Sequence, residues 1–270
     1  MSEYDDFLER LKSPGMEETW RSVKENLEQI PLDETLQELN QTSRMLHQVA
    51  NPMTVAMTTD AQWAGALRRL RSWRRALPAI EPQMPLGQVK VYLSTLLEMD
   101  DNVDDQIRAL GMSLPMVSKE QAHDLAVEFL HFYSPRRYPL GPQWVYSWKT
   151  ATGALPYLME FTNHLGLNGK DRFHAYGANY EELFMRLQGV GEMLKDHGLH
   201  RWGVYSTDLV LAYLYADYLY KMYFTTSKSI FSTIPTVLGV VSYLLGLAIP
   251  PQAVPTGVPV EAPDSWMEQS

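Results

Sequence analysis

Five arginines and a tryptophan occupy eight consecutive positions in the first third of the chain. They are Arg68, Arg69, Arg71, Trp73, Arg74 and Arg75. A guanidinium group can donate two parallel hydrogen bonds to a carboxylate or a phosphate, so this arginine run could bind either kind of anion. The chain as a whole carries a formal net charge of -9, and its average field repels nucleic acid and anionic lipid. We expect the arginine run to contact an acidic protein surface, in this chain or in a partner, in preference to nucleic acid.

A second candidate contact surface lies at residues 134–148, where regular helix is disfavoured. Three prolines within eight residues, Pro135, Pro139 and Pro142, each lack the amide donor that a helix needs. The candidate partner-binding side chains of this segment are Arg136, Arg137, Tyr138 and Trp144. The expected partner is another protein or a second copy of this chain.

Acidic residues cluster at positions 98–105. Asp100 and Asp104 are four residues apart and would share one face of a helix, with Asp101 beside them. This spacing resembles the aspartate-rich motif with which prenyl-diphosphate enzymes hold magnesium against a diphosphate. Those enzymes also need a second acidic motif, which the sequence lacks. A magnesium-dependent diphosphate enzyme is therefore one hypothesis, and a solvated acidic helix start without a metal is favoured over it.

The composition excludes several kinds of chemistry. The chain has no cysteine, which excludes disulfides, thiolate metal sites and a cysteine nucleophile and favours a cytoplasmic location. Nucleophile elbows, phosphate-binding loops, dinucleotide fingerprints and zincin motifs are also missing from the sequence. Histidine pairs occur at His123 with His131 and at His197 with His200, and their spacing favours structural roles over a metal site. We expect no cofactor, and we favour a non-catalytic accessory or adaptor protein that acts through protein contacts.

The spacing of apolar residues predicts an all-α protein, a multi-helix bundle with an irregular loop rich in proline and aromatic residues. Apolar positions recur every three or four residues over 2–77, and breaks near residues 14, 31, 52 and 78 divide this part into four short helices. We expect an N-terminal helical layer at 1–79, a main helical domain at 86–249 and a flexible proline-rich tail at 250–270.

Three longer helices are expected in the main domain. Ser118 and Gln121 have the spacing of a capping box and predict a helix over Lys119–Tyr133. Further helices are expected over Tyr180–Asp196 and over 207–224. The last of these carries apolar residues on more than one side, so we expect it to be buried.

The pentapeptide Leu187-Gln188-Gly189-Val190-Gly191 is similar to the hairpin of the helix-hairpin-helix superfamily, which includes DNA glycosylases. In that family the glycines, here Gly189 and Gly191 around Val190, let backbone amides approach a DNA phosphate. The resemblance spans residues 118–224 and includes a proline-containing helix end at 129–140. It departs from the lyase members at Met193, where they carry lysine, and at Asp208, whose spacing is shifted. The resemblance thus implies an alternative function, a nucleic-acid-binding module without catalytic activity.

Residues 230–249 form an uncharged and largely apolar run. About 20 apolar residues in a helix reach across a hydrocarbon core, and the charged side chains that follow this run are all acidic, so length and charge permit a membrane anchor. Pro235 and several hydroxyl groups make the run less apolar than a typical anchor. We expect a C-terminal apolar helix over 234–248 that is buried or docked, with membrane association as the alternative.

Overall fold

The computed structural model describes residues 3–98, 103–147, 152–163, 180–220 and 236–247. These residues form the all-α fold that the sequence predicts, with twelve α-helices, two short 3-10 helices and no β-strand in the described ranges. In chain order they are α1 (Glu3–Leu11), α2 (Pro14–Glu28), α3 (Asp33–Val49), η1 (Val55–Met57), α4 (Asp60–Leu67), α5 (Arg71–Ile80), α6 (Leu86–Glu98), α7 (Val103–Ser113), α8 (Lys119–Tyr133), α9 (Ala154–Asn163), α10 (Tyr180–Asp196), η2 (Gly203–Tyr205), α11 (Ser206–Leu219) and α12 (Val237–Leu244).

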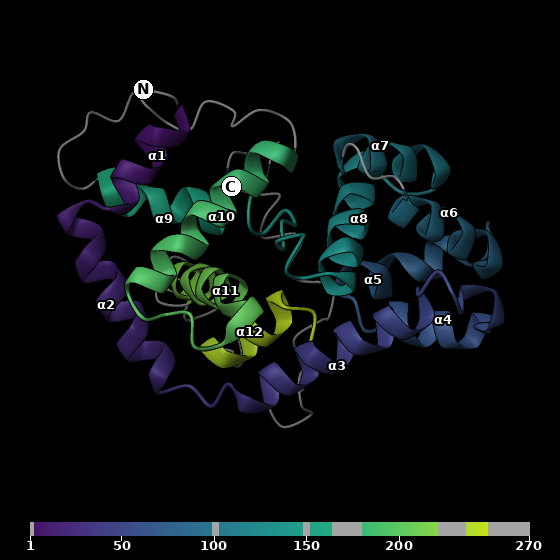
Figure 1. The fold of residues 1–270 in the computed structure, drawn as a ribbon, viewed down its shortest axis with the longest axis horizontal. Coiled ribbons are helices and arrows are strands. Elements are labelled where there is room, and N and C mark those ends of the chain that lie inside the picture. Colours follow the sequence, from purple (N-terminus) through teal and green to yellow (C-terminus); the bar gives the residue numbers. More distant parts are fainter. Residues whose placement is uncertain (1–2, 99–102, 148–151, 164–179, 221–235, 248–270) are drawn as a thin grey trace, which may run out of the picture.

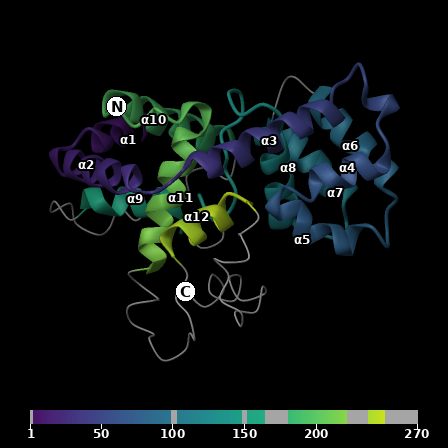
Figure 2. The same ribbon diagram turned by 90° about the horizontal axis from the view of Figure 1, so that it is seen from below.

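The helices form two lobes that α3 joins (Figure 1). In one lobe α1 packs on α9 and α10, and α2 packs on α9 and α11. In the other lobe α4 packs on α6, while α5 and α7 pack on α8. The helix α3 runs from one lobe to the other and packs on α4 and α8, as the second view also shows (Figure 2). The predicted boundary between 1–79 and 86–249 therefore does not separate the lobes, because α1 and α2 pack with helices from the C-terminal half.

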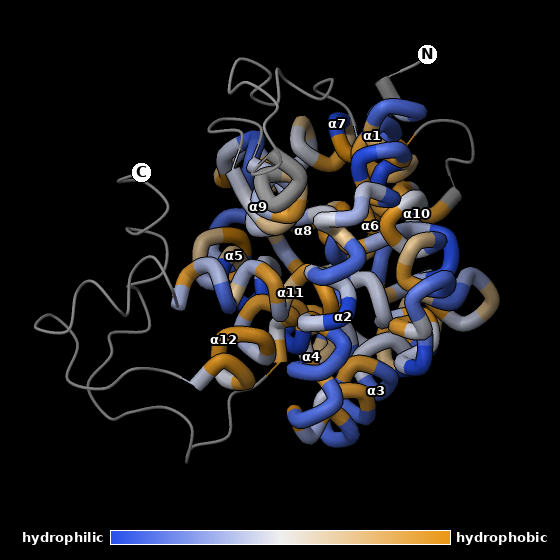
Figure 3. Tube along the Cα trace, turned by 90° about the vertical axis from the view of Figure 1, so that its left-hand side faces the viewer, coloured by the Kyte–Doolittle hydropathy of each residue, from blue (hydrophilic) through white to orange (hydrophobic). Residues whose placement is uncertain are grey.

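The helix α11 lies at the centre of the first lobe. Its residues from Leu209 to Ala216 are all buried, which confirms the prediction that this helix is covered on more than one side. The covering elements are α2, α9, α10 and α12. Apolar residues follow each other along α11 and α12 (orange in Figure 3). A helix that is apolar on all sides is stable only where neighbouring elements remove it from water.

Capping explains several helix boundaries. The Ser118 hydroxyl accepts a hydrogen bond from the amide of Gln121 at 3.2 Å, and the Gln121 side chain accepts one from the Ser118 amide at 2.9 Å. This capping box starts α8 at Lys119, as predicted. The predicted bounds of α10 are also confirmed, and α11 begins one residue before its predicted start. The predicted part of that helix beyond residue 220 lies outside the described residues.

The prediction of four short helices before residue 80 is wrong, since the described residues contain five there. The expected break at Pro78 does not occur: Pro78 lies inside α5, flanked by the buried residues Leu77 and Ile80. The unpredicted break falls between α4 and α5. There the carboxylate of Glu128 accepts hydrogen bonds from the amides of Arg71 at 2.8 Å and Ser72 at 2.7 Å. This buried cap starts a new helix at Arg71. At the other end of α5, the packing of the last turn offsets the hydrogen bond that Pro78 cannot donate.

The described part of the apolar run at 230–249 contains α12, whose Val241 and Leu244 are buried and which packs on α11. Two arginines of α5 reach the end of this segment. The guanidinium carbon of Arg71 lies 4.5 Å from the ring centroid of Tyr243, and Arg74 donates a hydrogen bond of 3.3 Å to the Gly246 carbonyl. Over the residues that the structure describes, no helix has both the length and the apolar character to cross a membrane. Residues 230–235, 248–249 and the predicted tail at 250–270 lie outside the described residues.

Gly246 offers a test of how tightly this C-terminal segment docks. Its φ is +78°, and an added Cβ would lie 3.1 Å from Arg71 and 3.2 Å from the Glu128 carboxylate. We expect Gly246→Ala to lower the free energy of unfolding by about 1–2 kcal/mol, because the left-handed backbone and the close contacts both oppose a side chain. Urea denaturation followed by circular dichroism measures the change.

The matched control is Gly65→Ala in the interior of α4, where an added Cβ meets nothing within 4 Å. Alanine favours a helix interior over glycine, so this variant should be unchanged or stabilised by up to about 1 kcal/mol. Equal stability of Gly246→Ala and the wild type would show that the segment does not dock as described.

Candidate functional site

The arginine run contacts acidic residues of this chain at its start. Arg68 forms an exposed ion pair with Glu81 at 3.0 Å. Arg69 pairs with Glu38 of α3 and donates a hydrogen bond of 3.1 Å to the Thr42 hydroxyl. The side of the run that faces α3 is therefore engaged within the protein.

The remaining members of the run face the protein core or the C-terminal segment. Trp73 is fully buried, and its indole nitrogen donates a hydrogen bond of 2.9 Å to the carbonyl of Leu125. Arg71 is 8% exposed and stacks on Tyr243, Arg74 bonds to the Gly246 carbonyl, and Arg75 also has an interaction within the chain. Through these contacts the arginine run holds α3, α5 and α12 together.

The proline-rich segment after α8 divides its predicted contact residues between surface and core. Tyr138 and Trp144 are buried, at 7% and 2% exposure. Arg136 and Arg137 are exposed, and the guanidinium carbon of Arg137 lies 5.1 Å from the ring centroid of Tyr138. Of this set, the two arginines are exposed at the surface, and Arg137 there stacks on Tyr138.

Asp104 caps another helix of the fold. Its carboxylate accepts hydrogen bonds from the amides of Tyr180 at 2.7 Å and Glu181 at 3.3 Å, the first two residues of α10. Asp100 and Asp101 lie outside the described residues. Among the residues that are described, no group of three histidine or acidic side chains could hold a metal ion.

The glycines of the predicted hairpin occupy the interior of α10 instead of a turn. Gly189, Val190 and Gly191 are helical residues within the predicted helix α10. Gly189 allows close packing, because an added Cβ would lie 2.7 Å from Leu8 and 3.2 Å from the Tyr4 hydroxyl of α1. A helix that backs onto α1 at this point cannot offer the Gly189 amide to a phosphate.

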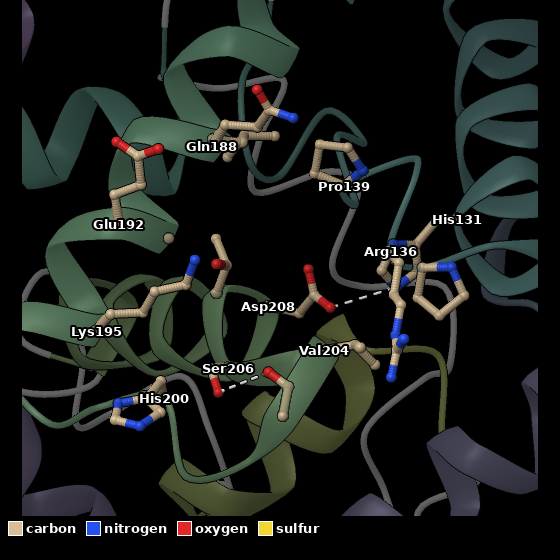
Figure 4. Close-up of a pocket in the computed structure, with 15 residues that line it drawn as sticks. His131, Arg136, Pro139, Gln188, Glu192, Lys195, His200, Val204, Ser206 and Asp208 are labelled. Carbon is tan, nitrogen blue, oxygen red and sulfur yellow. Dashed lines mark hydrogen bonds and ion pairs between the residues drawn. The ribbon is translucent and has the colours of Figure 1, made fainter.

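A pocket of about 320 Å³ opens between the end of α8, the middle of α10 and the start of α11 (Figure 4). Its buried polar side chains are His131, Ser206 and Asp208, and the exposed ones at its mouth are Arg136, Gln188, Glu192, Lys195 and His200. Of the residues that the sequence predicts as functional, Arg136 and Gly191 lie here, and the arginine run lies elsewhere.

His131 and Asp208 form a buried pair at the floor of this pocket. Nε2 of His131 lies 3.3 Å from Oδ2 of Asp208, and the two side chains are 1% and 4% exposed. Nδ1 of His131 lies 2.7 Å from the Tyr138 carbonyl, which can only accept, so Nδ1 must carry a proton. Neither His131 Nε2 nor Asp208 Oδ2 has a well-aligned hydrogen-bond partner in the described part of the chain. The Asp208 side chain also lines the cavity, as Figure 4 shows.

Electrostatics favour the charged form of His131. Burial lowers the pKa of His131, but the Asp208 carboxylate, the Tyr138 carbonyl and Glu128 together raise its pKa above the ordinary value. Asp208 is the third residue of α11, where the positive end of the helix dipole stabilises a carboxylate. The pair can therefore accept a hydrogen bond through Asp208 and can exchange a proton with a bound molecule.

Sequence reasoning missed this constellation as a group. His131 follows Phe129 and Leu130 in an apolar stretch of α8, and Asp208 precedes the apolar residues of α11. An ionisable side chain within an apolar run is a signal for a partner, since burying it alone is costly. The sequence does not show that these two residues, 77 positions apart, face each other.

Comparison with protein-family models, with curated proteins and with solved structures finds no match to this chain. Its function must therefore be argued from the geometry of the site.

The capping role of Asp104 makes Asp104→Ala a test of the metal hypothesis. We expect this variant to lower the free energy of unfolding by about 0.5–2 kcal/mol, with or without magnesium, because two amides of α10 lose their acceptor. Asp105→Ala is the control, because Asp105 forms an exposed pair with Arg108 and should change stability by about 0.5 kcal/mol or less. Stabilisation of the wild type by magnesium that is lost only in Asp104→Ala would contradict the capping role.

The His131–Asp208 pair makes a prediction about pH. Because the folded pKa of His131 lies above 6.5, its charge stabilises the fold fully below pH 6.5 and loses this effect as pH rises through the folded pKa. Long-range ¹H–¹⁵N NMR of the imidazoles should show His131 titrating above pH 6.5 in the wild type and lower in Asp208→Asn. A wild-type pKa at or below 6.5 would show that Asp208 does not hold the imidazolium.

Proposed function

We propose that this protein binds a small polar molecule in the pocket between α8, α10 and α11. The observation that carries the proposal is the buried Asp208 carboxylate, which lines the cavity beside His131 (Figure 4) and whose Oδ2 has no well-aligned hydrogen bond in the described residues. A buried carboxylate whose hydrogen bonds are incomplete is costly, and a ligand hydroxyl or amine that donates to it would lower that cost. Asp208 is thus proposed as the main acceptor for the ligand, with His131 beside it.

The form of the pocket supports this proposal. Small-molecule sites are concave, lie between packed elements and place a few convergent polar groups against an apolar frame. Here Leu187, Pro135 and Pro139 belong to the apolar part of a lining that is mostly polar and includes the His131–Asp208 pair. The volume of about 320 Å³ is at the lower end of the range for ligand sites, so the proposed ligand is small.

The functions predicted from the sequence have less support from the geometry. An accessory protein that acts through the arginine run would use side chains that already contact Glu38, Glu81 and Tyr243 in this chain. A nucleic-acid module of the hairpin type would use Gly189 and Gly191, which lie within α10. Both remain hypotheses, and ligand binding is the function we favour.

A thermal-shift panel of sugars, polyols, amino acids and nucleosides, each with its phosphorylated form where one exists, tests the proposal. We expect at least one compound to raise the Tm of the wild type, since a ligand at 100 times its Kd adds about 2.7 kcal/mol. Asp208→Asn should lose this response, because the amide replaces the charged acceptor.

The control is Asp196→Asn, which removes an exposed carboxylate at the end of α10 and should respond like the wild type. Thr207→Val, a change of similar size at the half-buried pocket wall, serves as a second pocket variant if Asp208→Asn does not fold. A panel in which no compound stabilises the wild type more than the pocket variants would refute the proposal.

A further inference from the structure

Two cations stand at the mouth of the pocket from opposite sides. Arg136 belongs to the segment after α8, and Lys195 reaches from α10 toward the middle of the pocket (Figure 4). Both are exposed, and neither forms a hydrogen bond or an ion pair within the described residues. By contrast the neighbouring Arg137 stacks on Tyr138. Arg136 and Lys195 are therefore available to an anion that enters the pocket.

The charges that line the pocket favour such an anion. His131 and Asp208 neutralise each other at the floor, so Arg136 and Lys195 face Glu192 as the remaining acid, with His200 also at the mouth. This gives a local excess of positive charge in a chain whose net charge is -9. The first turn of α11, whose Ser206 and Thr207 also line the pocket, adds the positive end of a helix dipole.

The floor and the mouth require different chemical groups of one ligand. The Asp208 carboxylate can only accept, so the inner end of the ligand must carry a hydroxyl or an amine. The outer end must be anionic, and the forked guanidinium of Arg136 beside the ammonium of Lys195 suits a phosphate, which presents three acceptor oxygens. A carboxylate offers fewer acceptors and a smaller charge than a phosphate monoester at neutral pH.

We propose, resting on the ligand-binding function above, that the pocket takes a small hydroxylated phosphate monoester. Its phosphate binds between Arg136 and Lys195, and a hydroxyl of the same molecule donates to Asp208. An exposed arginine and lysine alone would not be evidence for a ligand. The buried His131–Asp208 pair supplies that evidence. The phosphate contacts supply most of the affinity, while the hydroxyl contact sets the orientation.

The test uses isothermal titration of the full chain with glucose 6-phosphate and glycerol 3-phosphate at constant ionic strength. Glucose, glycerol and inorganic phosphate are the matched probes that lack one end of the ligand. We expect at least one ester to bind more tightly than its uncharged parent and than inorganic phosphate. Arg136→Gln and Lys195→Gln should each weaken that binding by about tenfold or more. Arg137→Gln, beside Arg136 in the sequence, should bind like the wild type.

The outcomes separate this proposal from the ligand-binding function. If an uncharged compound of the thermal-shift panel needs Asp208 but no phosphate ester binds, the phosphate subsite is wrong and the pocket function stands. If the esters bind equally well to Arg136→Gln and Lys195→Gln, the subsite is also wrong. Binding of a duplex oligonucleotide that requires these two cations, without binding of any ester, would assign the pocket mouth to nucleic acid and overturn the proposal. The far-UV circular dichroism of each variant confirms that it is folded.

Discussion

The burial of α11 is the constraint on which the remaining structure depends. Every side of this helix must be covered, because an apolar helix surface in water costs about 25 cal/mol for each Å² that stays exposed. The helices α2, α9, α10 and α12 provide that cover. They come from both halves of the chain, so the first lobe cannot be assembled from consecutive elements. The polar start of α11 opens onto the pocket, and this places Asp208 in its lining.

A second constraint is that charged side chains buried where the lobes meet must have hydrogen-bond or ion-pair partners. Glu128 of α8 is 4% exposed, and burial raises the pKa of this carboxyl while the amides of Arg71 and Ser72 act in the opposite direction. Through these two hydrogen bonds a side chain of α8 fixes where α5 begins. Arg71 then stacks on Tyr243 of α12, so one buried acid orders three segments of the chain. Charged groups that would be costly alone are here shared between helices.

The sequence predicts those features that depend on local chemistry. The capping box at Ser118 and Gln121 defines the start of α8, and apolar residues on several sides mark α11 as a core helix. Prediction from the sequence fails where a partner distant in the chain determines the local structure. A new helix begins after Leu70 because Glu128 caps α5 at Arg71 from 57 residues away, and no pattern near Leu70 contains that information. The candidate site fails to emerge for the same reason, since Asp208 acquires its role only opposite His131.

The contacts between Arg74 and Gly246 also constrain the order in which the chain can fold. The two residues are 172 positions apart, and the hydrogen bond between them closes the C-terminal segment onto α5. During synthesis at roughly 5–20 residues per second, α5 and α8 leave the ribosome long before residue 246, and they wait on the order of 10–30 s for it. Through that interval the second lobe must persist with Arg71 and Glu128 uncovered on one side. Ribosomal synthesis thus makes the α4–α8 lobe the part of this protein that must hold its shape first.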